Sequence, residues 1–270
     1  MWNNLARLLR YRGLIQALVV RELKARYRGS VLGFFWSFIN PLLLLSVYSF
    51  VFETIMPNLQ KETVPFAVFM FCGLLPWTWF SASLMEASGA LISGGNLIKK
   101  VLFPAEVLPI VAVLANMVHF ALGLLILAGF MIGYQHFPDW YELWWFPVIV
   151  LVQLIFTLGL GLLLAALTVH FRDIRDLLSN LLTLWFFATP IIYFYQMDSV
   201  KNFYWMFRLN PFYHLAVSYQ EILFFHPPIA GSPSFGHMAS LLYLGGASIV
   251  FFLFGYWVFD RLRDSFAEVV

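Results

Sequence analysis

Basic side chains gather just before the first long apolar stretch of the sequence, where they could bind phosphate. Arg21, Lys24, Arg26 and Arg28 all fall within residues 21–28. A guanidinium group can bind two oxygens of one phosphate, whereas a lysine ammonium acts as a point charge. Two roles fit these residues. They can anchor the chain to anionic lipid, at about 1 kcal/mol per basic residue, or help to admit the anionic head group of a lipid-linked substrate at the cytoplasmic face.

Aromatic side chains recur at helical spacing within two of the apolar stretches. Belts at the membrane interface account for many Trp and Tyr residues, but not for rings along a whole helix. Aromatic rings stack on the apolar C–H faces of sugars, so this pattern favours a path along which a carbohydrate slides. Glu53 is either a helix-end carboxylate that reaches the lipid head groups or part of a gate. The candidate path residues are Phe34, Phe38, Tyr48, Phe52, Glu53, Trp185, Thr189 and Tyr193.

The sequence lacks the usual motifs for nucleotide hydrolysis and metal binding. Nothing matches the phosphate-binding pattern G-x-x-x-x-G-K-[ST], and there is no H-E-x-x-H. The one cysteine, Cys72, lies within an apolar stretch, so no cysteine metal site is expected. His119 stands alone in another stretch without an acidic neighbour, which favours a neutral, hydrogen-bonded histidine over a proton relay. We therefore expect no catalytic residue, metal ion or cofactor in this chain.

Long stretches without Asp, Glu, Lys or Arg must position these candidates. Hydrophobic residues make up 61% of the chain and charged residues 11%, which excludes an ordinary soluble protein. About 20 apolar residues cross a bilayer core as a helix. The sequence thus predicts an all-α polytopic membrane protein with six transmembrane helices, at residues 33–56, 64–85, 106–133, 146–169, 177–195 and 238–259.

The basic residues between these helices are distributed unevenly, which predicts the orientation. With both termini in the cytoplasm, the outside segments hold Lys61, Lys201 and Arg208, and the other thirteen of the 16 Lys and Arg residues lie inside. Cytoplasmic loops carry an excess of Lys and Arg. We therefore expect the N-terminus and the C-terminus to lie inside.

Three further segments have patterns of their own. Residues 1–30 predict a basic amphipathic helix in the membrane interface. Residues 96–103 predict a short cytoplasmic helix. Residues 196–237 are rich in aromatic residues and proline, which predicts short helices that dip into the outer leaflet before the last span.

Small residues four positions apart let two membrane helices approach closely. Gly129 with Gly133, and Gly161 with Ala165, have this spacing. Such pairs are weak signals when they stand alone, and we use them only to predict close packing.

Several motifs, in order along nearly the whole chain, resemble one family. They are residues 21–41 (RELKARYRGSVLGFFWSFINP), 73–77 (GLLPW), 96–104 (NLIKKVLFP), 171–176 (FRDIRD), 189–193 (TPIIY) and 210–211 (NP). Together they resemble the ABC-2 type permeases that export polysaccharides such as O-antigen, capsule and teichoic acid. These are membrane subunits of ATP-driven exporters.

The resemblance implies a homodimer in the bacterial inner membrane, bound to two copies of a separate ATPase subunit that holds ATP and Mg²⁺. It implies a lipid-linked polysaccharide as substrate, O-antigen first, moved along a path lined by the first and fifth spans. Residues 196–237 would be the outer-face gate. Membrane lipids are expected partners, and nucleic acid is not. The segment that docks on the ATPase would comprise Asn96, Leu97, Ile98, Lys99, Lys100, Val101 and Phe103.

Three other interpretations remain open at this stage. An ABC-2 permease for drugs or small lipids would predict a large extracellular domain or fewer aromatic path residues. An ion-coupled carrier needs intramembrane charges that this sequence lacks. A membrane-embedded glycan enzyme needs a catalytic carboxylate or basic cluster on a large outer loop, and residues 196–237 offer only Asp198, Lys201, Arg208 and Glu221.

Overall fold

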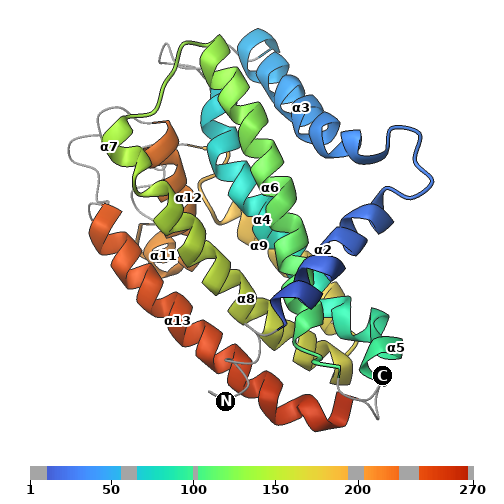
Figure 1. The fold of residues 1–270 in the computed structure, drawn as a ribbon. Coiled ribbons are helices and arrows are strands. Elements are labelled where there is room, and N and C mark those ends of the chain that lie inside the picture. Colours follow the sequence, from blue (N-terminus) through green and yellow to red (C-terminus); the bar gives the residue numbers. More distant parts are fainter. Residues whose placement is uncertain (1–10, 56–65, 100–102, 194–203, 225–236, 267–270) are drawn as a thin grey trace.

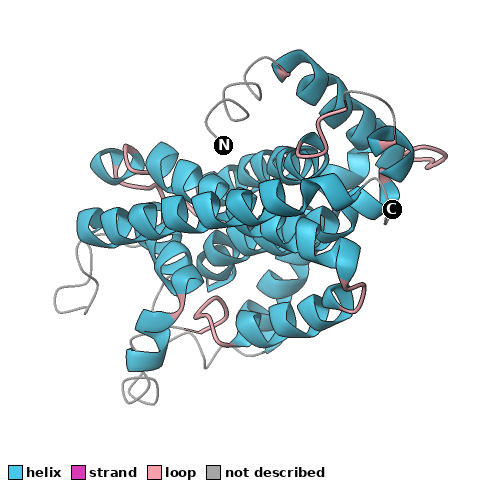
Figure 2. Ribbon diagram, turned by 90° about the horizontal axis from the view of Figure 1, so that it is seen from below, coloured by secondary structure: helices cyan, strands magenta, loops and turns pink. Residues whose placement is uncertain are grey.

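The computed structural model describes residues 11–55, 66–99, 103–193, 204–224 and 237–266. The described part is a bundle of helices without a strand (Figures 1 and 2). Its longer helices are α2 (Arg12–Arg26), α3 (Trp36–Ser49), α4 (Phe66–Ser93), α6 (Val107–Gly133), α8 (Phe146–His170), α9 (Ile174–Phe187), α12 (Pro211–Leu223) and α13 (His237–Leu262). Shorter pieces are η1 (Gly33–Phe35), η2 (Phe50–Ile55), α5 (Gly95–Ile98), α7 (Trp140–Leu143), α11 (Tyr204–Leu209) and η4 (Arg263–Ser265).

Among the residues that the structure describes, four helices are long and apolar enough to cross a membrane. They are Phe66–Ser93, Val107–Gly133, Trp140–His170 and Leu241–Ser265, and they match the second, third, fourth and sixth predicted spans. A helix satisfies all of its backbone groups internally, which is what a bilayer core requires. The prediction of an all-α polytopic membrane protein is therefore confirmed.

The other two predicted spans correspond to shorter helices. For residues 33–56 the structure has α3, which continues into the π-helical segment η2. For residues 177–195 it has α9, which begins at Ile174 and ends at Phe187. Pro190 explains the early end, because it disfavours the α conformation at Thr189. Residues 194 and 195 lie outside the described part.

The second helix is longer than the sequence predicts. The expected span ended at Met85, before the charge of Glu86, but α4 continues to Ser93. Glu86 is accommodated because its carboxylate pairs with Arg26 of α2. The charge that looked like the end of a span is a contact between two helices.

Helix α4 is the centre of the bundle. It packs against α6, α8 and α12, and most of its side chains are buried. Aromatic pairs contribute to this packing: the rings of Phe80 and Phe156 stack with centroids 5.7 Å apart, and Trp77 meets Phe212 edge to face at 4.9 Å. The centre of the bundle is thus fixed by large apolar contacts.

Helices α8 and α13 touch at two glycines. A Cβ atom on Gly255 would lie 2.1 Å from the carbonyl oxygen of Gly159, and one on Gly159 would lie 2.6 Å from Cα of Phe252. Of the pairs named from the sequence, Gly161 does face another helix, since its Cβ would lie 3.2 Å from Ala87, whereas Gly129 and Gly133 face open space. The closest contact uses glycines in two different helices.

This contact predicts a position-specific effect of alanine in α13. Gly255→Ala should destabilise the protein by about 2 kcal/mol or more, because a methyl group there collides with backbone that cannot move alone. Gly246→Ala in the same helix should be tolerated, since nothing lies within 4 Å of its Cβ position. Thermal unfolding in detergent measures both. Equal effects of the two substitutions would contradict the close contact.

Candidate functional site

Arg26, at the end of α2, joins three helices through its guanidinium group. It forms an ion pair with Glu86 of α4 and donates to Oδ1 of Asn116 of α6 at 3.0 Å. Asn116 in turn donates from Nδ2 to the Glu86 carboxylate at 2.7 Å. We call these three residues the Arg26 bridge. It is closed on itself, because each member contacts the other two.

Tyr27 forms a second polar contact beside the Arg26 bridge. Its hydroxyl lies 2.6 Å from Oγ of Ser37 and 2.6 Å from Nε2 of His119. Nδ1 of His119 lies 3.0 Å from the carbonyl oxygen of Ala115. Because a carbonyl only accepts, Nδ1 of the neutral ring carries the hydrogen and Nε2 accepts from Tyr27. His119 is therefore a hydrogen-bonded residue between α6 and the start of α3, as the sequence favoured.

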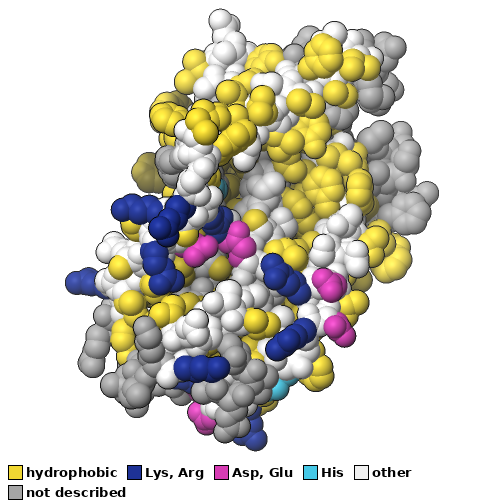
Figure 3. Space-filling view, turned by 90° about the vertical axis from the view of Figure 1, so that its right-hand side faces the viewer, with side chains coloured by type: hydrophobic (Ala, Val, Ile, Leu, Met, Phe, Trp, Pro, Cys, Tyr) yellow, Lys and Arg dark blue, Asp and Glu magenta, His cyan; other side chains and the backbone are white. Residues whose placement is uncertain are grey.

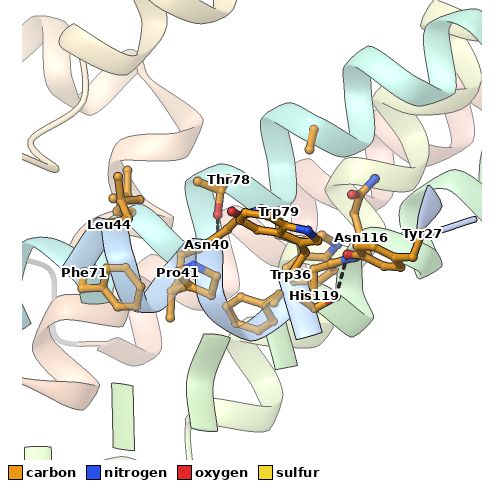
Figure 4. A pocket seen from close by; sticks show the side chains of 15 residues that line it. Tyr27, Trp36, Asn40, Pro41, Leu44, Phe71, Thr78, Trp79, Asn116 and His119 are labelled. Carbon is orange, nitrogen blue, oxygen red and sulfur yellow. Dashed lines mark hydrogen bonds between the residues drawn. The ribbon is translucent and has the colours of Figure 1, made fainter. Parts of the chain in front are cut away.

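An apolar cavity of about 350 Å³ lies between α3, α4 and α6 (Figure 4). Tyr27, Asn116 and His119 lie toward one end in this view, and Leu44 and Phe71 toward the other. Trp36 and Trp79 lie between them. We call this space the apolar cavity; its polar end adjoins the Arg26 bridge, because Asn116 belongs to both.

A second hollow, of about 530 Å³, lies between α2, α4, α5 and α6 and reaches the start of α9. We call it the polar groove. Its polar lining consists of Arg21, Glu22, Glu86, Ser93, Asn96 and Arg175. In Figure 3 the charged side chains lie in the lower part of the face, and apolar side chains cover the upper part. The groove therefore belongs to the charged end of the molecule.

One face of α4 stays partly open, and all of its residues except Met85 are small or polar. The residues of this α4 stripe are Thr78, Ser81, Ala82, Met85, Glu86, Gly89, Ala90 and Ser93. A hollow of about 460 Å³ separates its Thr78 and Ser81 from Ser179 and Thr183 of α9, and the apolar cavity lies on its α3 side. Outward residues elsewhere are large and apolar, such as Leu125 and Leu242. The stripe is unlike a lipid-facing surface.

Asn210 holds the start of α12 against the end of α9. Its Oδ1 accepts from the Trp185 indole at 2.6 Å and from the Phe212 amide at 3.0 Å. Its Nδ2 donates to the carbonyl oxygen of Ala188 at 3.2 Å and to Oγ1 of Thr189 at 3.0 Å. One side chain thus caps the N-terminus of α12 and hydrogen-bonds a backbone carbonyl at the C-terminal end of α9.

The predicted path residues lie in different surroundings. Thr189 is fully buried, Trp185 packs on Trp77 and Phe80, and the Tyr193 hydroxyl donates to the carbonyl oxygen of Phe187 at 3.1 Å. Phe38 and Tyr48 of α3 are half-buried. The backbone positions of Phe34, Phe52 and Glu53 are in η1 and η2, and their side chains lie outside the description. The path through these residues stays a prediction.

The predicted docking segment is described only in part. Asn96, Leu97 and Ile98 form most of α5, followed by Lys99; Lys100 and Val101 lie outside the described residues. Asn96 and Lys99 are exposed, whereas Leu97, Ile98 and Phe103 are half-buried against the bundle. Docking through this segment stays a prediction.

The four basic residues predicted to bind phosphate differ in their exposure. Arg21, Lys24 and Arg28 are exposed, whereas Arg26 is half-buried in its bridge. Sequence reasoning missed Glu86 and Asn116, because no local motif marks a partner from a distant helix. Arg175 and Asn210 fall within the motifs 171–176 and 210–211, but sequence reasoning assigned neither of them a role. Among the described residues there is no group of three or more His, Cys, Asp or Glu side chains that could hold a metal ion.

Comparisons with known proteins give one consistent result. The family model for the ABC-2 type transporter matches residues 13–224. The chain is similar to the O-antigen export system permease protein RfbA of Myxococcus xanthus, with 43% identity over 97% of both chains, and to that of Klebsiella pneumoniae, with 31% identity over 95% of both. It is also similar to the polysialic acid transport protein KpsM of Escherichia coli, with 26% identity over 74% of this chain and 77% of that one.

The Arg26 bridge predicts coupled effects on stability. Arg26→Met leaves the Glu86 carboxylate without its cation, and Glu86→Gln leaves the guanidinium with only the more distant Glu22 carboxylate, 3.9 Å away, so each should destabilise the protein by about 1–3 kcal/mol. The double variant should be less destabilised than the sum of the two. Arg28→Met is the control, since Arg28 is exposed. Strictly additive losses in thermal unfolding would show that the two residues act separately.

Proposed function

Because the chain belongs to the ABC-2 type transporter family, we propose that it is the permease subunit of an ATP-driven exporter of a lipid-linked polysaccharide, with O-antigen as the first candidate. The observation that carries this proposal is the 43% identity with an O-antigen export permease over nearly the full length of both chains. The helical bundle agrees with it, since four helices are suited to cross a membrane. The chain is then a transporter subunit and not an enzyme.

In this proposal ATP is hydrolysed by a separate subunit, present in two copies, which also holds Mg²⁺. The absence of a phosphate-binding loop motif in the sequence supports this division of labour. The permease resides in the inner membrane of a bacterium as a multi-pass protein. Export from the cytoplasm starts with a lipid-linked polymer in the cytoplasmic leaflet.

The proposed topology has six spans with both termini inside. Two observations support it. The basic residues are concentrated in the segments that this topology places in the cytoplasm. In addition, α3 with η2 covers residues 36–55 as one helical run, long enough for a bilayer core of about 30 Å at 1.5 Å per residue. Helix α9 is shorter and would cross together with the residues that follow Pro190.

The proposed path lies between two protomers. One protomer of six spans is too small to enclose a hydrated polymer, so a homodimer has to supply the second wall. Helix α9 supports this, because only Leu178 and Leu182 are buried in it. The α4 stripe lies between α3 and α9 and adds hydroxyls to the wall. We therefore assign the wall to three helices, α3, α4 and α9, where the sequence predicted two.

A capsule polysaccharide is the second candidate substrate, because the similarity to KpsM covers 74% of this chain. O-antigen ranks first, since its permeases match with higher identity over more of the chain. Deleting the gene should leave the lipid-linked polymer in the cytoplasm of the source bacterium. Analysis of the retained glycan then identifies the substrate, and normal export of every surface glycan would overturn the proposal.

The docking segment predicts where the ATPase binds. Single cysteines at Asn96 or Lys99, both exposed, should form crosslinks with cysteines in a groove of the ATPase subunit, because a short amphipathic helix fits such a groove. Arg172, exposed in the other cytoplasmic turn, is the matched control position. Efficient crosslinking at Arg172 and none at residues 96–103 would place the contact elsewhere.

The path predicts a pattern of water access. Cysteines at Tyr48, Tyr193 and Ser81 should react with a membrane-impermeant thiol reagent when the complex is held open or carries polymer. A cysteine at Leu242, on the large apolar surface of α13, should stay unreactive because lipid covers it. If only positions in the third or fourth span react, the polymer takes another route.

A further inference from the structure

Two hollows of different chemistry meet at the Arg26 bridge. Asn116 lines the apolar cavity, and Glu86 lines the polar groove. These two side chains bond to each other and to Arg26. The bridge therefore stands between an apolar space and a polar one, an arrangement that matches a molecule with an apolar chain and a charged head.

The apolar cavity has the size of part of one hydrocarbon chain. An apolar cavity of about 150 Å³ in another protein holds one benzene molecule. The present cavity, of about 350 Å³, therefore has room for roughly a dozen carbon atoms on that scale. Its walls include Trp36, Leu44 and Phe71. Two acyl chains side by side would need more space, so the cavity favours a lipid with a single chain.

The polar groove supplies cations for a head group. Arg21 and Arg175 both line it, and neither has an ion-pair partner within the part of the chain that the structure describes. Ser93 and Asn96 add hydrogen-bonding groups to the same lining, and Glu22 adds a carboxylate that lies 3.9 Å from Arg26. Guanidinium groups of this kind favour a phosphate, which accepts two hydrogen bonds from each.

The bridge between the two hollows can exchange its partners. The Glu86 side chain is 38% exposed and that of Arg26 is 21% exposed, so an incoming anion can reach the pair from the groove. A phosphate that replaced the Glu86 carboxylate would keep the charge of Arg26 compensated. The exchange would also open the wall at the point where head and chain are joined.

We propose that the polar groove and the apolar cavity together bind the phosphate end of a single-chain lipid, with the phosphate in place of Glu86 on Arg26 and the first carbons of the chain in the cavity. This inference rests on the proposed function, since it assigns the lipid carrier of the exported polymer to this site. It adds Arg175, Glu86 and the cavity of α3, α4 and α6 to the residues that select the substrate.

The test uses the permease with its ATPase in nanodiscs and a polyprenyl diphosphate that carries a diazirine near the phosphate. Illumination should label peptides of α3 and α4 that line the cavity. Glu86→Gln should raise the labelling several-fold, because it removes the nearer of the two carboxylates that pair with Arg26; the other, of Glu22, lies 3.9 Å away. Arg26→Gln should lower it about tenfold, the effect of a lost charged hydrogen-bond pair. Arg12→Gln, at an exposed position at the start of α2, is the matched control and should leave labelling unchanged.

A second variant tests the site without changing a charge, so its result does not depend on whether the charge variants fold. Ala82→Leu fills part of the cavity wall without changing any charge, and it should lower cavity labelling while thermal unfolding stays the same. Labelling that is spread over the surface of α13 and unaffected by Glu86→Gln would overturn the site. Equal cavity labelling by a diazirine phosphatidylglycerol would overturn the assignment to a single-chain lipid.

Polymer export is measured in parallel in cells that carry each variant. If export depends on the permease but Ala82→Leu and Glu86→Gln leave both export and labelling unchanged, the lipid site is wrong and the proposed function stands. If the deleted gene has no effect on export of any glycan, the function itself is wrong. The two failures are therefore distinct.

Discussion

Polar groups inside an apolar bundle need partners within the protein, and this constraint decides how the shorter helices are attached. A buried donor, acceptor or charge without a partner costs from about one to several kcal/mol. Arg26 satisfies this requirement by joining α2 to α4 and α6. Tyr27 satisfies this requirement at the start of α3, where its hydroxyl bonds to Ser37 and His119. Asn210 satisfies it at the end of α9, where its side-chain amide donates to Ala188 and Thr189. Each of these short helices makes one polar cluster with its neighbours, and α2 also packs its Leu18 on Val107 and Val111 of α6.

The long helices are held by other means. Helices α8 and α13 meet through Gly159 and Gly255 with backbone in contact, and α4 is surrounded by stacked rings such as Phe80 on Phe156. Apolar contacts of this kind cannot be exchanged for water or for a ligand without loss. Hydrogen bonds and ion pairs can be exchanged, because a new donor or anion can take the place of the old one. The molecule thus combines a core with fixed contacts and attached helices with exchangeable ones.

The sequence was sufficient for those features that depend on local composition. Uncharged stretches of adequate length predicted the four long helices, and the motifs predicted the family. Features that depend on a distant partner were not predictable. The charge of Glu86 suggested the end of a span because Arg26, its partner, belongs to another helix. The path role of Thr189 stays a prediction from its residue type; its burial and its hydrogen bond from Asn210 became visible only in the structure. The α4 stripe could be recognised only once the neighbours of α4 were known.

The same reasoning shows which part of the protein can move at low cost. Moving a helix exposes the side chains it buries, at about 25 cal/mol for each Å² of apolar surface in water. Among the residues of α3 whose side chains are described, only Ser37 and Leu45 are buried, and α3 lines the apolar cavity. Helix α9 buries only Leu178 and Leu182. Helix α3 also joins α2 through Gly29 and Gly33, which have positive φ values of 81° and 50°. Glycine adopts such values without the steric cost that a Cβ atom would bring. If the polymer takes the proposed path between α3 and α9, these two helices can separate while α4, α6, α8 and α13 keep their contacts. The energy required is then mainly that of exchanging the polar clusters at Arg26, Tyr27 and Asn210.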